Sequence, residues 1–280
     1  MERRKFTQIV AMMGMASLFG GATSSCASQQ STHVSEEKQH ADAMAQYSDL
    51  SGGEHLIIGM LVYPEMYLLD FVGPLSVFES LMNREIHLIW KNSEPISSTS
   101  SHIQITPTTT FENCPEHLDV LFVPGGVPGT FTMMEDLEVL SFLATKGKTA
   151  RYISSVCTGS LILGSAGLLN GYRATSYWSL KDVLSEFGAI VCDERVVVDR
   201  NRITGGGVTA GIDLALTITE RLRNQTYAKA IQLYLEYDPA PPFNSGSPEK
   251  APKVVKKFLL DMFQGMHEKA LTIAKKKVRV

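Results

Sequence analysis

One cysteine stands where a predicted strand ends and a predicted helix begins. Cys157 lies between the β-rich residues 152–156 and a helical pattern that starts at Thr158. A strand-to-helix turn of this kind holds a nucleophile in a strained conformation and projects it into a pocket. Free N–H groups at a helix start favour a thiolate, so the position predicts a lowered pKa and a reactive Cys157. The alternative is a small buried residue, as free cysteines often are.

Two further segments carry groups that could assist a nucleophile. Gly125 and Gly126 follow Pro124 at the end of another predicted strand. Glycines there let backbone N–H groups approach a substrate and form an anion or oxyanion site. Asp70 lies within the apolar residues 68–74, where a carboxylate is costly to bury without a partner or a task. The alternative for Asp70 is a helix N-cap.

The elements that must position these groups alternate along the chain. Residues 55–63, 118–123 and 152–156 are apolar or β-rich runs and predict buried strands. Helical patterns cover residues 68–82 (with an interruption near Gly73-Pro74), 136–148, 158–169, 209–223, 226–236 and 252–269, and residues 196–204 predict a hairpin. The alternation predicts an α/β fold with a mainly parallel sheet covered on both faces. Ligand sites in such sheets lie at the carboxyl ends of the strands, where the three segments above are placed.

Five sequence stretches together resemble a known family. The loop with Asp70, the Pro-Gly-Gly loop and the Cys157 turn occur in the order found in the ThiJ/PfpI superfamily. Residues 203–213 and 235–248 extend the similarity, which covers about residues 55–270 and is greater to the isonitrile hydratase branch. The resemblance implies one catalytic domain: a parallel-sheet sandwich of the class I glutamine-amidotransferase-like (flavodoxin-like) type with a nucleophile elbow.

The resemblance also implies a reaction and the residues that perform it. Cys157 would be the nucleophile, Thr158 would assist it, and Asp70 would be required for activity. The expected chemistry is hydration of an isonitrile to an N-substituted formamide, with no metal or organic cofactor. Residues expected to bind the substrate are Gly125, Gly126, Val208 and Trp178.

Two positions separate this chain from other members of the superfamily. Thr158 stands where the proteases and many glyoxalases of the superfamily have His, which argues against those activities. Tyr177 stands before Trp178, where relatives often have His, and indicates a different fit to the substrate.

Two other classes of function remain as alternatives. One is a family member that is not a hydratase, in which Cys157 is redox-sensitive or senses a small molecule. The other is a transcription regulator, for which the residues after Pro252 are too few to form a helix-turn-helix region. The net charge of −3 gives no electrostatic reason to expect nucleic-acid binding. The basic tail at residues 271–280 is typical of a solvated helix end.

The amino terminus predicts an export signal at residues 1–27. Arg3, Arg4 and Lys5 precede an uncharged, mostly apolar run at residues 9–20, which is too short to span a bilayer. The two arginines resemble a twin-arginine signal. Cleavage after Ala27 or Ala22 would give a periplasmic protein, and a lipid anchor at Cys26 is an alternative. The alternative for the whole segment is an uncleaved anchor or a disordered tail, and without a functioning signal the chain would be cytoplasmic.

Two further features of the sequence are the segment at residues 28–54 and the cysteines other than Cys157. Residues 28–54 lack an apolar period and predict a flexible linker. The four cysteines (Cys26, Cys114, Cys157 and Cys192) form no CxxC pair and no zinc pattern. Cys114 is expected in a packed loop and Cys192 at the end of a core strand. The resemblance further implies a homodimer that acts on a small-molecule substrate. After removal of the signal, no stable insertion in a membrane is expected.

Overall fold

The computed structural model describes residues 38, 41–42, 44–50, 52–98 and 103–277. The chain divides into two compact units, Met1–Tyr47 and Ser48–Val280. The predicted export signal, Cys26 and most of the predicted linker lie outside the described residues. Glu54, at the end of that linker, forms an ion pair with Arg151, and its carbonyl accepts a hydrogen bond from Arg223 at 2.8 Å. The last linker residues are therefore held to the domain.

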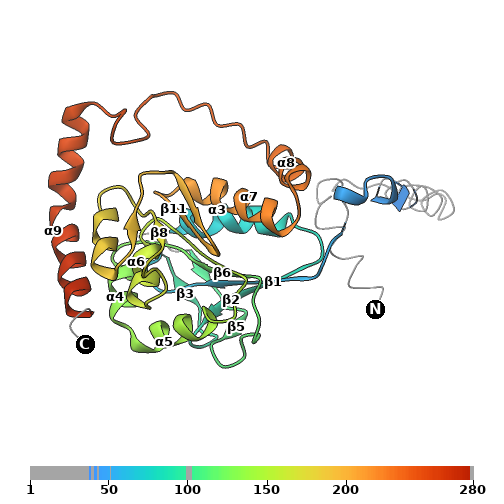
Figure 1. The fold of residues 1–280 in the computed structure, drawn as a ribbon, viewed down its shortest axis with the longest axis horizontal. Coiled ribbons are helices and arrows are strands. Elements are labelled where there is room, and N and C mark those ends of the chain that lie inside the picture. The colour runs from blue at the N-terminus through green and yellow to red at the C-terminus, as the bar shows by residue number, and fades with distance from the viewer. Residues whose placement is uncertain (1–37, 39–40, 43, 51, 99–102, 278–280) are drawn as a thin grey trace, which may run out of the picture. The chain divides into compact units, whose positions relative to one another are not determined.

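A seven-stranded sheet forms the centre of the second unit (Figure 1). The spatial order is β10-β11-β7-β6-β1-β2-β5, and every neighbouring pair is parallel except β10 and β11. The strands are β1 (Leu56–Leu61), β2 (Arg84–Trp90), β5 (Thr109–Thr110), β6 (Val120–Val123), β7 (Tyr152–Val156), β10 (Val196–Asp199) and β11 (Arg202–Gly205). Two small pairs lie outside this sheet: β3 (Ile96–Ser97) with β4 (Gln104–Ile105), and β8 (Arg173–Ala174) with β9 (Ile190–Val191).

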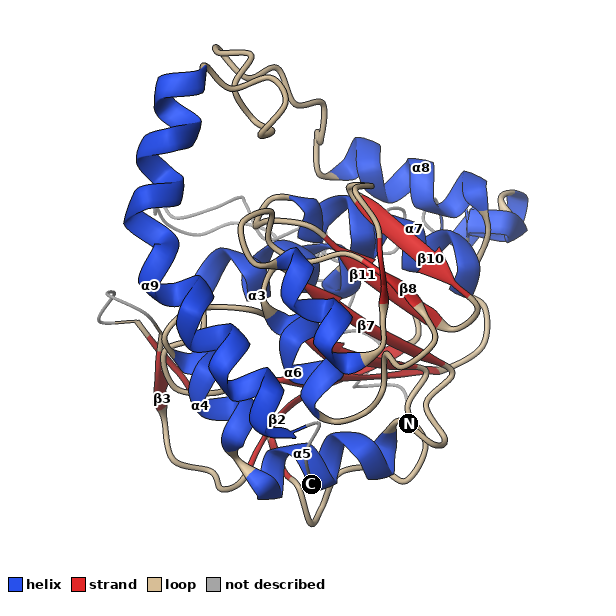
Figure 2. Ribbon diagram, turned by 60° about the vertical axis from the view of Figure 1, so that its left-hand side comes forward, coloured by secondary structure: helices blue, strands red, loops and turns tan. Residues whose placement is uncertain are grey.

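Helices cover both faces of the sheet, as Figure 2 shows. Helices α3 and α7 pack together on one face, and α4, α5 and α6 pack on the other. The helices are α3 (Leu68–Glu79), α4 (Gly129–Glu135), α5 (Leu137–Lys146), α6 (Gly159–Ser165), α7 (Ala210–Leu222), α8 (Gln225–Tyr234) and α9 (Lys253–Lys277), with 3₁₀ turns η1 (Ser48–Leu50) and η2 (Lys181–Phe187). Among the described residues, none of these helices is both long and apolar enough to cross a bilayer.

The central strands are buried on both faces. All four residues of β6 are buried, and the apolar residues of β1 include Leu56, Ile58 and Met60 with no exposed surface. Strands between two helix layers have no solvent-facing side, which explains their continuous apolar runs. The predicted fold class, with its mainly parallel sheet, is confirmed.

Four helices differ from the sequence prediction. Helix α3 continues through Gly73-Pro74 without interruption, although Pro74 has no N–H to donate within the helix. Helix α6 ends at Ser165 rather than at residue 169. Helix α4 was not predicted, and α9 runs to Lys277, so most of the predicted basic tail is helical.

Candidate active site

Cys157 occupies a strained turn between β7 and α6. Its φ of +56° lies in the left-handed region, which costs a non-glycine residue about 1–3 kcal/mol. The Cys157 N–H donates to the carbonyls of Gly205 (3.1 Å) and Gly206 (2.8 Å), and its carbonyl accepts from Ser176 Oγ at 2.9 Å. These bonds to the segments around β8 and β11 hold the strained turn in place and give the elbow that the sequence predicted.

Asp70 lies in the first turn of α3 and has no exposed surface. The N-cap of α3 is Tyr67, so the alternative that Asp70 caps a helix is wrong. Neither carboxyl oxygen makes a hydrogen bond of ordinary geometry with a described residue. The Cys157 side chain and the Gly125 N–H nevertheless approach it closely enough to lower its pKa. Burial outweighs both and raises the pKa of Asp70 to about 7.

The Cys157 thiol is also harder to ionise than the sequence predicted. Burial raises its pKa well above the ordinary value, and the charge and hydrogen bonding of Asp70 raise it further. The N–H groups of Thr158 and Val208 favour the thiolate but do not outweigh these effects. The predicted lowering of the pKa is therefore wrong, because two acidic groups share one buried space and cannot readily both be charged.

The Pro-Gly-Gly loop packs directly against Asp70 and Thr158. A Cβ atom at Gly125 would lie 2.6 Å from the Thr158 nitrogen and 2.8 Å from Asp70 Oδ2, so only glycine fits there. The Gly126 N–H donates to Thr158 Oγ1 at 3.0 Å. This donor is occupied in this arrangement, and the predicted oxyanion role of Gly126 stays a prediction.

A chain of buried hydroxyl groups continues from Thr158. Thr158 Oγ1 lies 2.7 Å from Thr130 Oγ1, which lies 3.4 Å from Tyr63 Oη. Tyr63 in turn donates to the Pro124 carbonyl at 2.9 Å. Sequence reasoning missed Tyr63 and Thr130, because isolated hydroxyl residues carry no spacing signal and tertiary packing alone brings them together.

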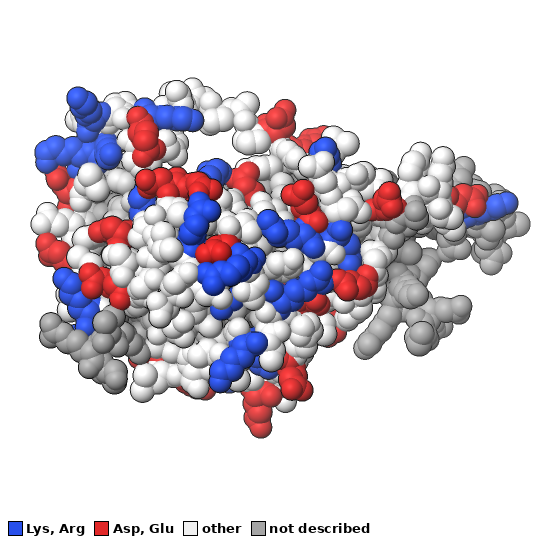
Figure 3. Space-filling model, viewed as in Figure 1, with Lys and Arg blue, Asp and Glu red and all other residues white. Residues whose placement is uncertain are grey.

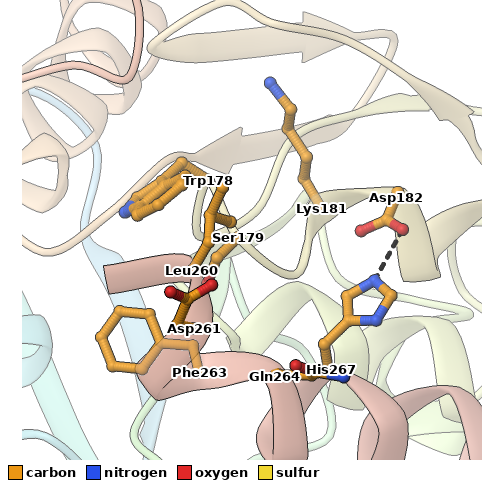
Figure 4. Close-up of a pocket in the computed structure, with 9 residues that line it drawn as sticks. All are labelled: Trp178, Ser179, Lys181, Asp182, Leu260, Asp261, Phe263, Gln264 and His267. Carbon is orange, nitrogen blue, oxygen red and sulfur yellow. Dashed lines mark hydrogen bonds and ion pairs between the residues drawn. The ribbon is translucent and has the colours of Figure 1, made fainter. Parts of the chain in front are cut away.

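Val208 lies next to the Cys157 turn, whereas Trp178 lines a groove. The Val208 N–H approaches the Cys157 sulfur, and the neighbouring Gly207 packs against the ring of Tyr177. Trp178 lines a groove of about 480 Å³ against α9 (Figure 4). Cys157 and Asp70 are not among the residues that line this groove.

Cys114 and Cys192, the other two cysteines within the described residues, lie in different surroundings. Cys114 is buried in a loop, as expected, whereas Cys192 follows β9 and is only half-buried, so the predicted core position is wrong. Among the described residues, no group of three or more His, Cys, Asp or Glu side chains is placed to bind a metal. Lys, Arg, Asp and Glu are interspersed on the face in Figure 3.

The sheet order, the cysteine elbow and the buried carboxyl group define an α/β protein of the class I glutamine-amidotransferase-like type. Residues 57–221 match the DJ-1/PfpI family, and the chain belongs to this family. It is 52% identical over 200 residues to an isonitrile hydratase of Pseudomonas putida, a match that covers 71% of this chain and 86% of that protein.

Two further similar proteins are one with a crystal structure and a transcription regulator. A crystal structure of a ThiJ/PfpI family protein from Pseudomonas syringae has 50% sequence identity and a TM-score of 0.78, and it covers 79% of this chain and 91% of that one. The HTH-type transcriptional regulator GbdR of Pseudomonas aeruginosa is 30% identical over 65% of this chain. That match covers 50% of the regulator.

Proposed function

We propose that this protein hydrates isonitriles to N-substituted formamides, with Cys157 as the nucleophile. The observation that carries the proposal is the buried pair of Cys157 and Asp70 at the elbow, in a chain 52% identical to an isonitrile hydratase. Cys157 is only 6% exposed. An isonitrile presents a thin, linear N≡C end, so its terminal carbon needs only a narrow opening to reach the sulfur.

In the first step sulfur adds to the terminal carbon of the isonitrile. Asp70 and Cys157 together hold one proton above about pH 7, because the pKa of the thiol lies well above that of the carboxyl. As the S–C bond forms, this proton passes through Asp70 to the same carbon. The product is a thioimidate, R–N=CH–S–Cys157, and Asp70 is left as a carboxylate.

In the second step water adds to the thioimidate carbon. The Asp70 carboxylate takes a proton from the water and passes it to the imidate nitrogen, which gives R–NH–CH(OH)–S–Cys157. Asp70 then removes the hydroxyl proton, the C–S bond breaks, and the formamide R–NH–CHO leaves. The pair again holds one proton, so atoms and charge balance without a metal or a redox cofactor.

The backbone around the pair supports the charges that develop. The N–H groups of Thr158 and Val208 approach the sulfur and stabilise it as it leaves in the second step. The Thr158 hydroxyl holds Gly126 at 3.0 Å and so positions the loop that packs against Asp70. Thr158 acts through this loop.

The redox alternative finds less support. A peroxide-sensitive cysteine is exposed and has a low pKa, because the thiolate is the species that reacts. Burial and Asp70 raise the pKa of Cys157, and the residue is almost fully covered. Both features favour a thiol that ionises only together with proton transfer to Asp70.

A panel of isonitriles assayed for formamide tests the proposal. The purified chain should convert at least one isonitrile to the corresponding formamide, and Cys157→Ser should lower kcat by at least a thousand-fold. Cys192→Ser is the matched control, because Cys192 is half-buried after β9 and should keep wild-type turnover. Full activity in Cys157→Ser would contradict the proposal.

The predicted homodimer and the predicted export remain proposals. For the full chain a dimer has twice the mass of 30.8 kDa, which light scattering after gel filtration measures directly. Export to the periplasm rests on residues 1–27, which lie outside the described residues.

A further inference from the structure

Hydrogen bonds run in series from the Pro-Gly-Gly loop through three buried hydroxyl groups and back to the same loop. The Gly126 N–H donates to Thr158 Oγ1 at 3.0 Å, and Thr158 Oγ1 lies 2.7 Å from Thr130 Oγ1. Thr130 Oγ1 lies 3.4 Å from Tyr63 Oη, which donates to the Pro124 carbonyl at 2.9 Å. All three hydroxyl residues are almost fully covered. Water therefore does not decide where their hydrogens point.

The two ends of this series fix the direction of every hydrogen in it. The single hydrogen of Tyr63 goes to the Pro124 carbonyl, so Thr130 must be the donor in its contact with Tyr63. Burial raises the pKa of Tyr63 well above its ordinary value, and the Thr130 hydroxyl lowers it in part, as a donor does. The hydrogen between Thr130 and Thr158 then belongs to Thr158. The reverse order would leave this buried hydrogen without a partner in the series, which is costly.

This direction commits the Thr158 hydrogen to Thr130 and withholds it from Asp70. Thr158 Oγ1 and Asp70 Oδ2 lie 2.7 and 2.8 Å from the point where a Cβ of Gly125 would lie, so the two oxygens border one space. Neither carboxyl oxygen makes a hydrogen bond of ordinary geometry with a described residue. A hydroxyl hydrogen donated to Asp70 would favour the carboxylate and make it a weaker base. Thr130 therefore keeps Asp70 able to take up a proton.

Cys157, Tyr63 and Tyr177 are titratable side chains that face Asp70 from other parts of the fold. Burial raises the pKa of each of the three, and the charge of Asp70 raises it further. All three keep their hydrogen near pH 7. No charge on these three groups then competes with a hydrogen bond in setting the proton affinity of Asp70.

We propose that Thr130 is a positioning residue for the hydration reaction, which holds the Thr158 hydrogen so that Asp70 stays free to take and give a proton. Tyr63 fixes Thr130 in turn, because its oxygen accepts the Thr130 hydrogen. The inference rests on the proposed hydratase function and adds two residues that act through Thr158. Helix α4, which carries Thr130, thereby serves the reaction from behind the elbow.

The pH dependence of kcat/KM in Thr130→Val tests this role. Valine has nearly the shape of threonine, and the backbone N–H at this position still donates to the Gly126 carbonyl at 2.6 Å. The released Thr158 hydroxyl then donates to Asp70, so the midpoint of the acid limb, near pH 7 in the wild type, should fall by about one pH unit. Above the midpoint, kcat/KM should drop about ten-fold, because a hydrogen-bonded carboxylate is a weaker base.

Three further variants separate this role from a loss of packing. Thr130→Ser keeps the hydroxyl and should retain the wild-type midpoint and rate. Thr219→Val is the matched control, because Thr219 on α7 is equally buried and donates to the Ala215 carbonyl of its own helix at 2.8 Å. It should leave the midpoint in place. Tyr63→Phe should lower the midpoint, and adding it to Thr130→Val should lower it no further.

An unchanged midpoint in Thr130→Val would overturn the inference, even if the rate falls. Midpoint shifts of Tyr63→Phe and Thr130→Val that simply add would also overturn it, because Tyr63 would then act independently of Thr130.

Unfolding in urea separates the inference from the proposed reaction. At pH 8 Asp70→Asn should stabilise Thr130→Val less than it stabilises the wild type, by about 1.4 kcal/mol for a tenfold loss of proton affinity. A chain that hydrates isonitriles, but whose midpoint and stabilisation by Asp70→Asn ignore Thr130→Val, would overturn the inference and leave the proposed function. A chain that hydrates no isonitrile, but shows the smaller stabilisation, would overturn the proposed function and support the control of Asp70 by Thr130.

Discussion

At the scale of single residues, Asp70 and Cys157 determine each other's protonation. Each is buried, and the charge of Asp70 opposes ionisation of the thiol beside it. The pair therefore carries one negative charge rather than two, and the proton can lie on either member. A shared proton is what addition to an isonitrile requires, because the same carbon takes both the sulfur and a hydrogen.

Replacement of Asp70 by Asn should stabilise the folded chain at high pH. In the unfolded chain Asp70 ionises near pH 3.8, and in the folded chain near 7. Between these values the unfolded state loses the proton first, so this group destabilises the fold progressively as pH rises, and fully above about 7. At about 1.4 kcal/mol for each tenfold change in proton affinity, the upper limit is roughly 4 kcal/mol.

Urea unfolding at two pH values measures this effect. The free energy of unfolding of Asp70→Asn should exceed that of the wild type by up to about 4 kcal/mol at pH 8 and by little at pH 4. The exposed Asp238→Asn serves as the control and should show no such pH dependence. A difference that stays constant from pH 4 to pH 8 would contradict the raised pKa of the buried Asp70.

Sequence reasoning identified some of these residues and missed others for physical reasons. Cys157 and Asp70 were found because a cysteine at a strand-to-helix junction and a carboxylate in an apolar run are each unusual locally. The sign of the Cys157 pKa change was wrong, because the depth of burial depends on the whole packed site. Tyr63 and Thr130 were missed because only the packed fold brings their hydroxyl groups next to Thr158.

At the scale of elements, the loop after β6 fixes the distance between α3, which carries Asp70, and the Cys157 turn. A Cβ at Gly125 would overlap Thr158 and Asp70 at less than 3.0 Å. Gly125→Ala should therefore displace the acid and lower kcat/KM for isonitrile hydration by about a hundred-fold or more, with a loss of stability of about 1–3 kcal/mol.

A second glycine supplies the control for this prediction. A Cβ at Gly265 on α9 would meet no described atom within 4 Å. Gly265→Ala should keep wild-type kinetics and raise the melting temperature slightly, because Ala favours a helix interior by about 1 kcal/mol over Gly. Wild-type rates in Gly125→Ala would show that the tight packing of this loop has no part in catalysis.

The strands were more predictable than the helices. Continuous apolar runs identify β1 and β6 because both faces of the sheet are covered, and β-rich residues identify β7. Helix α4 was missed because its sequence, with one Gly and two Thr, has weak helix propensity. Its packing against α6 and α9 stabilises the helix in place of local propensity. The end of α9 was misplaced because Ala270, Ile273 and Ala274 bury a helical face within a lysine-rich segment.

At the scale of the whole molecule, strand order brings together groups that are far apart in sequence. Strands β6 and β7 are neighbours, with β1 and β11 beside them, so the segments after all four strands meet at one edge of the sheet. This explains why Asp70, Gly125, Cys157 and Val208 are close although they span much of the chain. The alternation of elements predicted the edge, and only the structure gives the order of the strands.

The predicted export signal makes a testable statement about the whole chain. In a Gram-negative host the wild type should be recovered from the periplasm, with an amino terminus that starts after Ala27 or Ala22 by mass spectrometry. Replacing both Arg3 and Arg4 by Lys should keep the chain unprocessed in the cytoplasm. A wild-type chain that stays unprocessed in the cytoplasm would contradict the signal. A recovered chain with a lipid on Cys26 would instead show the lipid-anchor alternative.

Formation of a covalent bond between Cys157 and the substrate tests the account most directly. During turnover of an isonitrile, acid quenching and intact-mass analysis should show a species heavier than the chain by the mass of one isonitrile. Peptide mapping should place it on Cys157, and Cys157→Ser should lack both the adduct and the formamide product. Steady formamide production with no such adduct, or with the adduct on another residue, would contradict the account.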